Sequence, residues 1–359
     1  FLLAMPVPAW GASTELAPYL EDLDMEQIDA AAENAVEDVT FSELVEDVLT
    51  GDFSFSMEDL WEKLGEVAFG ELRTQTGLIM QLIAVSILAA VLRQVSGSFC
   101  GREVGEMGFY VCYMVLIVVI ITTFYDITAM VVERVEQTAD IFGAMLPVFL
   151  ALAASSGNLT QTALMGPTMM GGCTLIVLIL KSVVVPVLLA AVALELVDRL
   201  SEQPLTARFA ALLRQGVSWG LKGLAGGFML LLSLQKIGGG AVNGLAVRTA
   251  KIAVNAVPVV GDVMGGAVDT AAAVAGTIRS GTLAAAVIFL LLLCIPLVIK
   301  LVAMTLIFKL TAAAVESVCE ARLVECIGIA GDYTALLLGV VFLVEVMFLF
   351  SSVLLLGVL

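Results

Sequence analysis

The amino-acid sequence predicts an all-α, polytopic membrane protein with about six to eight transmembrane helices. Its clearest segment, Leu283–Leu310, is apolar throughout except for Lys300 and Lys309. A bilayer core about 30 Å thick needs about 20 apolar helical residues, and this segment lacks the polar face that a soluble helix shows every 3.6 residues. The composition agrees, because 60% of the residues are hydrophobic and 14% are charged, against about 45–50% and about 25% in soluble domains. Lipid is therefore the predicted solvent.

The net charge of −17 is concentrated near the N-terminus. Residues 1–70 hold 17 of the 34 acidic residues and only one basic residue, Lys63. This asymmetry predicts a domain boundary near residue 70. We expect a small acidic helical domain at 14–73 and a polytopic transmembrane domain at 74–359. Residues 1–13 are typical of a signal-peptide remnant or an N-terminal anchor, and either would place the acidic domain outside the cytoplasm.

The sequence gives no indication of catalysis or of a metal or cofactor site. It contains no histidine, which removes the commonest general base and metal ligand. Its six cysteines form no CxxC pair. No catalytic, cofactor-binding or metal-binding residue is therefore predicted.

Two spans are expected before residue 126, at 77–95 and 107–125. Arg93 and Arg102 lie at the loop between them, and the acidic run 126–140 follows the second. The positive-inside rule therefore places the basic loop in the cytoplasm and the acidic run outside. Residues 131–139 are too polar to cross and are expected to lie along the membrane interface.

The next segment is harder to place. Residues 141–154 are apolar but short, and the uncharged stretch to 172 is rich in Gly, Ser, Thr and Pro. The basic residues after the following apolar run belong in the cytoplasm, so only one full crossing fits, at 173–197. We therefore expect 141–172 to be re-entrant or broken, which requires cover from protein or a water-filled cavity.

The remaining spans are predicted at 216–235, 283–310 and 335–356, with an amphipathic cytoplasmic stretch at 311–334. Residues 237–281 are dominated by glycine and alanine, with scattered charges. We expect interfacial helices there, or a second re-entrant pair broken at Pro258 and Gly261.

Charged residues inside the predicted spans are the candidate functional residues. Lys181 and Glu345 lie near the middle of their spans, and a buried charge costs at least about 2.5–3.5 kcal/mol unless it is paired. The two are therefore expected to pair. Glu195 lies 14 residues from Lys181 and is expected on the same helix face. An ion or proton path is one interpretation; an interhelical clamp or a snorkelling lysine is the other. Lys300 is a further candidate.

Several stretches in this order resemble stage III sporulation protein AE of endospore-forming bacteria. They are GDFSFSMEDLWEKL, GEMGFYVCYMVLI, MLPVFLALAASSGN, VRTAKIAVNAVPVVGD and CIPLVIKLVAMTLIFKLTAA. The resemblance implies a multi-pass protein of the mother-cell membrane around the forespore, within a multiprotein channel or secretion-like apparatus. It supplies no catalytic residues. The positions that match recurring motifs are Pro147, Gly157, Pro167, Lys181, Pro186, Arg248, Lys251, Pro258, Gly261, Pro296 and Lys300.

Three hypotheses describe the function, of which the intramembrane enzyme is disfavoured because the sequence shows no histidine, no metal-ligand cluster and no serine or aspartate dyad at a recognisable spacing; two remain. The first is a non-enzymatic membrane subunit of the sporulation channel complex, required for late forespore gene expression. Its expected partners are other membrane subunits, the lipid bilayer and a second copy of itself, but no nucleic acid. The alternative is a stand-alone secondary transporter that uses Lys181, Glu195 and Glu345.

Overall fold

The computed structural model describes residues 25–32, 40–50, 65, 69–99, 102–155, 159–200, 206–254 and 261–355. The regular elements in these ranges are all helices. They are α2 (Glu26–Ala32), α3 (Phe41–Thr50), α5 (Thr76–Phe99), α6 (Arg102–Ser155), α7 (Leu159–Ile179), the π-helix η2 (Leu180–Val184), α8 (Val185–Asp198), α9 (Ala207–Val254), α10 (Gly261–Val315) and α11 (Ala321–Leu355).

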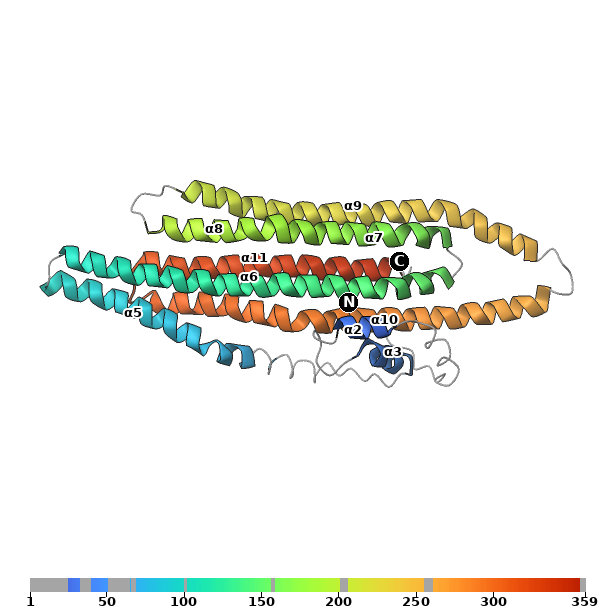
Figure 1. The fold of residues 1–359 in the computed structure, drawn as a ribbon, viewed down its shortest axis with the longest axis horizontal. Coiled ribbons are helices and arrows are strands. Elements are labelled where there is room, and N and C mark those ends of the chain that lie inside the picture. The colour runs from blue at the N-terminus through green and yellow to red at the C-terminus, as the bar shows by residue number, and fades with distance from the viewer. Residues whose placement is uncertain are drawn as a thin grey trace.

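The long helices lie side by side in an elongated bundle (Figure 1). In this view α6 and α11 occupy the middle, α7, α8 and α9 lie on one side, and α10 lies on the other with α5, α2 and α3. Helices α5, α8 and α10 finish at the same end of the bundle, where α6, α9 and α11 begin. This end carries Arg93, Arg199, Arg208 and Arg322, and we call it the arginine end.

Three helices are much longer than a bilayer requires. Helices α6, α9 and α10 contain 54, 48 and 55 residues, which at 1.5 Å per residue gives about 80, 70 and 80 Å. A helix of about 80 Å tilted by about 40° still covers about 60 Å along the membrane normal, twice the hydrocarbon thickness. Part of the bundle therefore extends beyond the hydrocarbon core.

The chain is an all-α membrane protein. Five described segments are long and apolar enough to cross a membrane: Thr76–Gln94, Glu106–Ala153, Gly166–Asp198, Ser280–Val315 and Ala321–Leu355. The predicted span 216–235 lies within α9, which carries Arg208, Arg214 and Lys222 and is not among these five.

The structure shows how helices run through three segments that the sequence predicted to be interfacial, re-entrant or broken. Residues 131–139, expected at the interface, lie inside the continuous helix α6. Residues 141–172, expected to be re-entrant or broken, form the end of α6 and the start of α7, two long antiparallel helices. Residues 237–254 continue α9, and Gly261 begins α10, while Pro258 lies outside the described residues. Charged residues are good helix formers, so a helix can continue past the level at which its sequence becomes polar.

The N-terminal helix α3 packs directly on α10. Phe41 makes an edge-to-face contact with Phe289, with ring centroids 5.6 Å apart. Leu49 lies so close to Gly281 that any side chain there would collide with it. On the opposite face of α3, Glu43, Glu46 and Asp47 are exposed or partly exposed. Because carboxylates do not face lipid, this level of the bundle lies in water or at the membrane surface.

Candidate functional site

Four helices meet at a group of polar side chains inside the bundle. Glu195 comes from α8, Arg214 from α9, Lys309 from α10, and Asp332 and Tyr333 from α11. We call these five residues the four-helix polar cluster. The flanking helical segments are largely apolar, so the cluster is a local departure from the composition of the bundle.

Each member of the cluster contacts another member on a different helix. The Tyr333 hydroxyl donates a hydrogen bond of 2.6 Å to Glu195. The Arg214 guanidinium lies 3.9 Å from Glu195 and 3.4 Å from Asp332. Lys309 forms an ion pair with the same Asp332 carboxylate. The cluster therefore links α8, α9, α10 and α11 in one continuous network.

Aromatic and small residues hold this network in place. The Arg214 guanidinium lies over the Tyr333 ring, 5.2 Å from its centroid, an arrangement that favours a cation. The Tyr333 ring also meets Phe124 of α6 edge to face, with centroids 6.4 Å apart. Gly331 leaves room for the Lys309 side chain, because a Cβ there would lie 3.3 Å from two of its carbons.

The cluster is electrically balanced and partly shielded from solvent. Two carboxylates face two cations, so the formal charges cancel. The Glu195 side chain is 18% exposed, and the other three charged side chains are 37–47% exposed. Arg214 stands between two carboxylates and can strengthen its contact with either. Chemically, the cluster can bind the four helices together or exchange ion-pair partners when they shift.

The structure gives Lys181 and Glu345 different partners. Lys181 forms an ion pair with Glu136 of α6, and both side chains are about half-exposed. Glu345 is 6% exposed, and its carboxyl meets the Cys294 thiol of α10 and the Thr138 hydroxyl of α6. One of its oxygens has no hydrogen-bond partner. The expected pair is therefore not formed, and Glu345 is a deeply buried carboxyl whose nearest charged neighbour is Arg134 of α6.

The π-helix η2 explains why Lys181 and Glu195 do not share a face. It spans Leu180–Val184, and the Val185 N–H bonds to the carbonyl of Leu180, five residues earlier. Such a turn contains one residue more than an α-turn, and it rotates the rest of the helix by about 100°. Pro186, which has no N–H to donate, comes directly after this turn. Lys181 is thereby directed to α6, and Glu195 to α9 and α11.

The remaining predicted positions are spread along the bundle. Lys300 lies 3.7 Å from Glu71, which joins α10 to the helical residues before α5. Pro147, Pro167 and Pro296 lie inside helices, and Pro186 lies near the start of α8; all four are exposed. Gly157 and Pro258 lie outside the described residues, as do the side chains of Arg248 and Lys251 of α9. The structure does not gather these positions into one site.

Sequence reasoning found one member of the cluster, Glu195, and missed four. Arg214, Lys309 and Asp332 are charged residues close to polar stretches, which makes them look like loop or interface residues. Tyr333 is adjacent to Asp332 in sequence but carries no charge to mark it. The one available signal was that Lys309 stands alone in an otherwise uncharged run from Leu301 to Val315.

Among the described residues, no group of three or more His, Cys, Asp or Glu is placed to hold a metal ion. The five described cysteines are free, and four of them are buried.

Most of the chain matches known proteins. Residues 39–358 match the family described as Stage III sporulation protein AE. The chain is 26% identical over 308 residues to Stage III sporulation protein AE of Bacillus subtilis (strain 168), covering 84% of this chain and 76% of that protein. No solved structure matches. The matched region includes every described helix from α3 to α11, so this chain belongs to the stage III sporulation protein AE family.

Proposed function

We propose that this protein is a non-enzymatic subunit of the membrane channel or secretion-like complex that links mother cell and forespore. In this proposal it lies in the mother-cell membrane around the forespore, works with other membrane subunits, and is required for late forespore gene expression. Membership of the sporulation family supports a sporulation role. The dimensions of the bundle support a role between two membranes.

The observation that carries the proposal is the length of the helices relative to the bilayer. Helices α6 and α10 are about 80 Å long, and the hydrocarbon core is about 30 Å thick. The arginine end fits the cytoplasmic side by the positive-inside rule. The acidic face of α3, near Phe289 of α10, then lies on the opposite side. The extra length of the bundle projects away from the mother-cell cytoplasm, toward the forespore.

The stand-alone transporter has weaker support. That hypothesis needs Lys181, Glu195 and Glu345 at a shared substrate site. Lys181 contacts Glu136, Glu195 contacts Arg214 and Tyr333, and Glu345 contacts Cys294 and Thr138. Three separate environments do not make one binding site.

Two measurements test the proposal. Purification of the tagged chain from detergent-solubilised sporulating cells should recover other sporulation membrane proteins in fixed ratio. Isolation as a lone species whose reconstituted vesicles take up a solute with an ion gradient would instead establish the transporter.

The second measurement determines on which side of the membrane the arginine end and the acidic face of α3 lie. In vegetative cells made to produce the chain, the non-cytoplasmic side of the plasma membrane faces the medium, so a membrane-impermeant maleimide should label Glu46→Cys in their intact protoplasts and should label Arg322→Cys only after lysis, both in a background in which Cys100 and Cys319 are replaced by alanine. The reverse labelling pattern would contradict the proposed direction of projection.

A further inference from the structure

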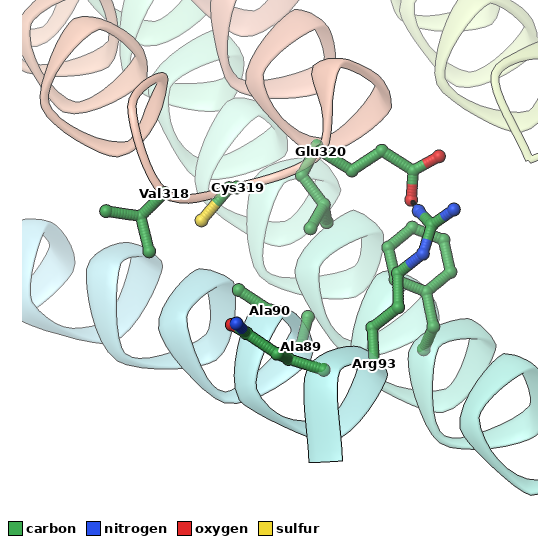
Figure 2. A pocket seen from close by; sticks show the side chains of 9 residues that line it. Ala89, Ala90, Arg93, Val318, Cys319 and Glu320 are labelled. Carbon is green, nitrogen blue, oxygen red and sulfur yellow. Dashed lines mark ion pairs between the residues drawn. The ribbon is translucent and has the colours of Figure 1, made fainter. Parts of the chain in front are cut away.

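A cavity of about 280 Å³ opens at the arginine end, between α5 and the turn that joins α10 to α11. Figure 2 shows Ala89, Ala90 and Arg93 of α5 on one side, with Val318, Cys319 and Glu320 of the turn on the other. Part of the wall is apolar and part is charged. Burial raises the pKa of the Cys319 thiol, so this wall residue is neutral.

The cavity lies at the level where membrane-spanning segments end. Four of the five candidate spans begin or finish beside it, at Gln94, Glu106, Val315 and Ala321. A shared boundary of this kind is where hydrocarbon gives way to lipid head groups. Large apolar side chains, including Ile87, Leu88 and Val91, are exposed on α5 just before it. Acyl chains can therefore run along α5 up to the opening.

The charged wall offers both signs of charge side by side. Arg93 and Glu320 form an ion pair, and the Arg93 guanidinium also lies over Phe109, 5.5 Å from the ring centroid. The other Glu320 oxygen lies 3.7 Å from the Arg322 guanidinium. A guanidinium has five N–H donors and a carboxylate about four acceptor positions, so each retains capacity for a ligand.

We propose that this cavity binds the head group of a phospholipid that carries both a phosphate and a primary ammonium. The phosphate contacts Arg93, the ammonium contacts Glu320, and the acyl chains lie against the exposed apolar face of α5. A guanidinium suits a phosphate because it can donate two parallel hydrogen bonds. A primary ammonium carries three N–H donors and can hydrogen-bond a carboxylate, whereas a trimethylated ammonium has no N–H to donate. The site is independent of the proposed role in sporulation, because it depends only on the position of the cavity at the membrane surface.

The test uses the full chain in detergent and three probe lipids with identical dioleoyl chains. These are phosphatidylethanolamine, phosphatidylcholine and phosphatidylglycerol, and binding is measured by native mass spectrometry. Phosphatidylethanolamine should bind about tenfold more tightly than the other two, the factor that one charge-assisted hydrogen bond supplies. Glu320→Gln should make phosphatidylethanolamine and phosphatidylcholine equal. Arg93→Gln should weaken all three.

Two further variants keep the result interpretable. Glu325→Gln removes the partner of Arg199 at the same end of the bundle but leaves the cavity intact, and it should keep the preference. Ala90→Leu fills the cavity without changing any charge and should remove the preference. Equal binding of all three lipids to the unmodified chain, or tighter binding of phosphatidylglycerol, would overturn the proposal. So would an equal loss of preference in Glu325→Gln and Glu320→Gln.

Discussion

The four-helix polar cluster and the surroundings of Glu345 are two different environments for a carboxyl group inside an apolar bundle. In the cluster, Glu195 meets a cation and a hydroxyl on two other helices. Glu345 is more deeply buried; its carboxyl contacts a thiol and a hydroxyl, and the nearest cation that acts on it is Arg134 of α6. A direct cation contact compensates the first carboxyl, whereas the second depends mainly on weakly polar neighbours. The cluster thus belongs to the interactions that hold α8 to α11 together, while Glu345 is a polar group that the packing of α6, α10 and α11 accommodates.

This difference predicts opposite responses to loss of charge. A compensated carboxyl should be needed in its ionised form, because its cations would otherwise lose their partner. An isolated carboxyl should be replaceable by a neutral residue of the same shape. Variants at both places test the distinction, from the largest expected effect to the smallest.

Glu345→Lys should have the largest effect. A cation would enter an apolar core without a partner, at a cost of at least about 3 kcal/mol. We expect little full-length protein in the membrane, measured by immunoblotting, and no complementation of a sporulation defect. The neutral Glu345→Gln should stay within about 1 kcal/mol of the unmodified chain. Rescue of Glu345→Lys by Lys181→Glu would contradict the separate environments of these two residues.

Arg214→Gln should be the most damaging neutral substitution in the cluster. It leaves Glu195 and Asp332 with Lys309 as the one remaining cation of the cluster. Because the side chains are partly exposed, we expect the free energy of unfolding to fall by about 2 kcal/mol. The midpoint of thermal unfolding in detergent measures this loss of stability. Adding Glu195→Gln should recover part of the loss, because the uncompensated carboxylate is then removed. Strictly additive losses would show that the two residues do not interact.

Gly331→Ala should disturb the cluster through packing alone. The new Cβ would lie 3.3 Å from Lys309 and from the Cβ of Phe308, so these side chains must shift by a few tenths of an ångström, which disturbs the Lys309–Asp332 ion pair. We expect a loss of about 1 kcal/mol, because crowding outweighs the gain in helix propensity. Gly339→Ala on the same helix meets only Leu221, at an ordinary 3.9 Å, and should be neutral or stabilising in the same melting experiment.

Lys181→Gln should have the smallest effect. Its ion pair with Glu136 is half-exposed, and such pairs contribute about 0–1 kcal/mol. A loss of thermal stability as large as that of Arg214→Gln would mean that Lys181 does more than form this pair.

The sequence predicted the fold class and most of the helical segments for a simple physical reason. Long uncharged or nearly uncharged runs such as 107–125 and 173–197 have no stable arrangement in water, so their location in the membrane is a consequence of composition alone. The ends of the helices were harder to predict. Glu133 and Arg134 suggested a segment along the membrane interface, but α6 continues through them to Ser155. The polarity of a segment indicates whether it lies in lipid or in water, but it does not show where a helix ends. A helix longer than the bilayer is thick passes through both.

The candidate site was less predictable because its contacts join distant parts of the chain. Glu195 and Tyr333 are 138 residues apart, and no local pattern indicates that they touch. The expected alignment of Lys181 with Glu195 assumed a regular α-helix. The single π-turn at Leu180–Val184 adds one residue and turns Glu195 to a different side of the helix. Glu345 was singled out as an intramembrane charge and lies in the candidate span Ala321–Leu355, but its contacts Cys294 and Thr138 carry no charge and gave no signal.

The balanced charges of the four-helix polar cluster also bear on which energy source can move it. A single elementary charge carried across a membrane gains about 2.3 kcal/mol per 100 mV of potential. Two positive and two negative groups displaced as one unit gain nothing. The cluster itself therefore contributes nothing to the work that the membrane voltage can do on a shift of α8 to α11 that keeps these ions together. The energy for displacing the cluster as a unit has to come from another source, such as molecules that bind to the bundle.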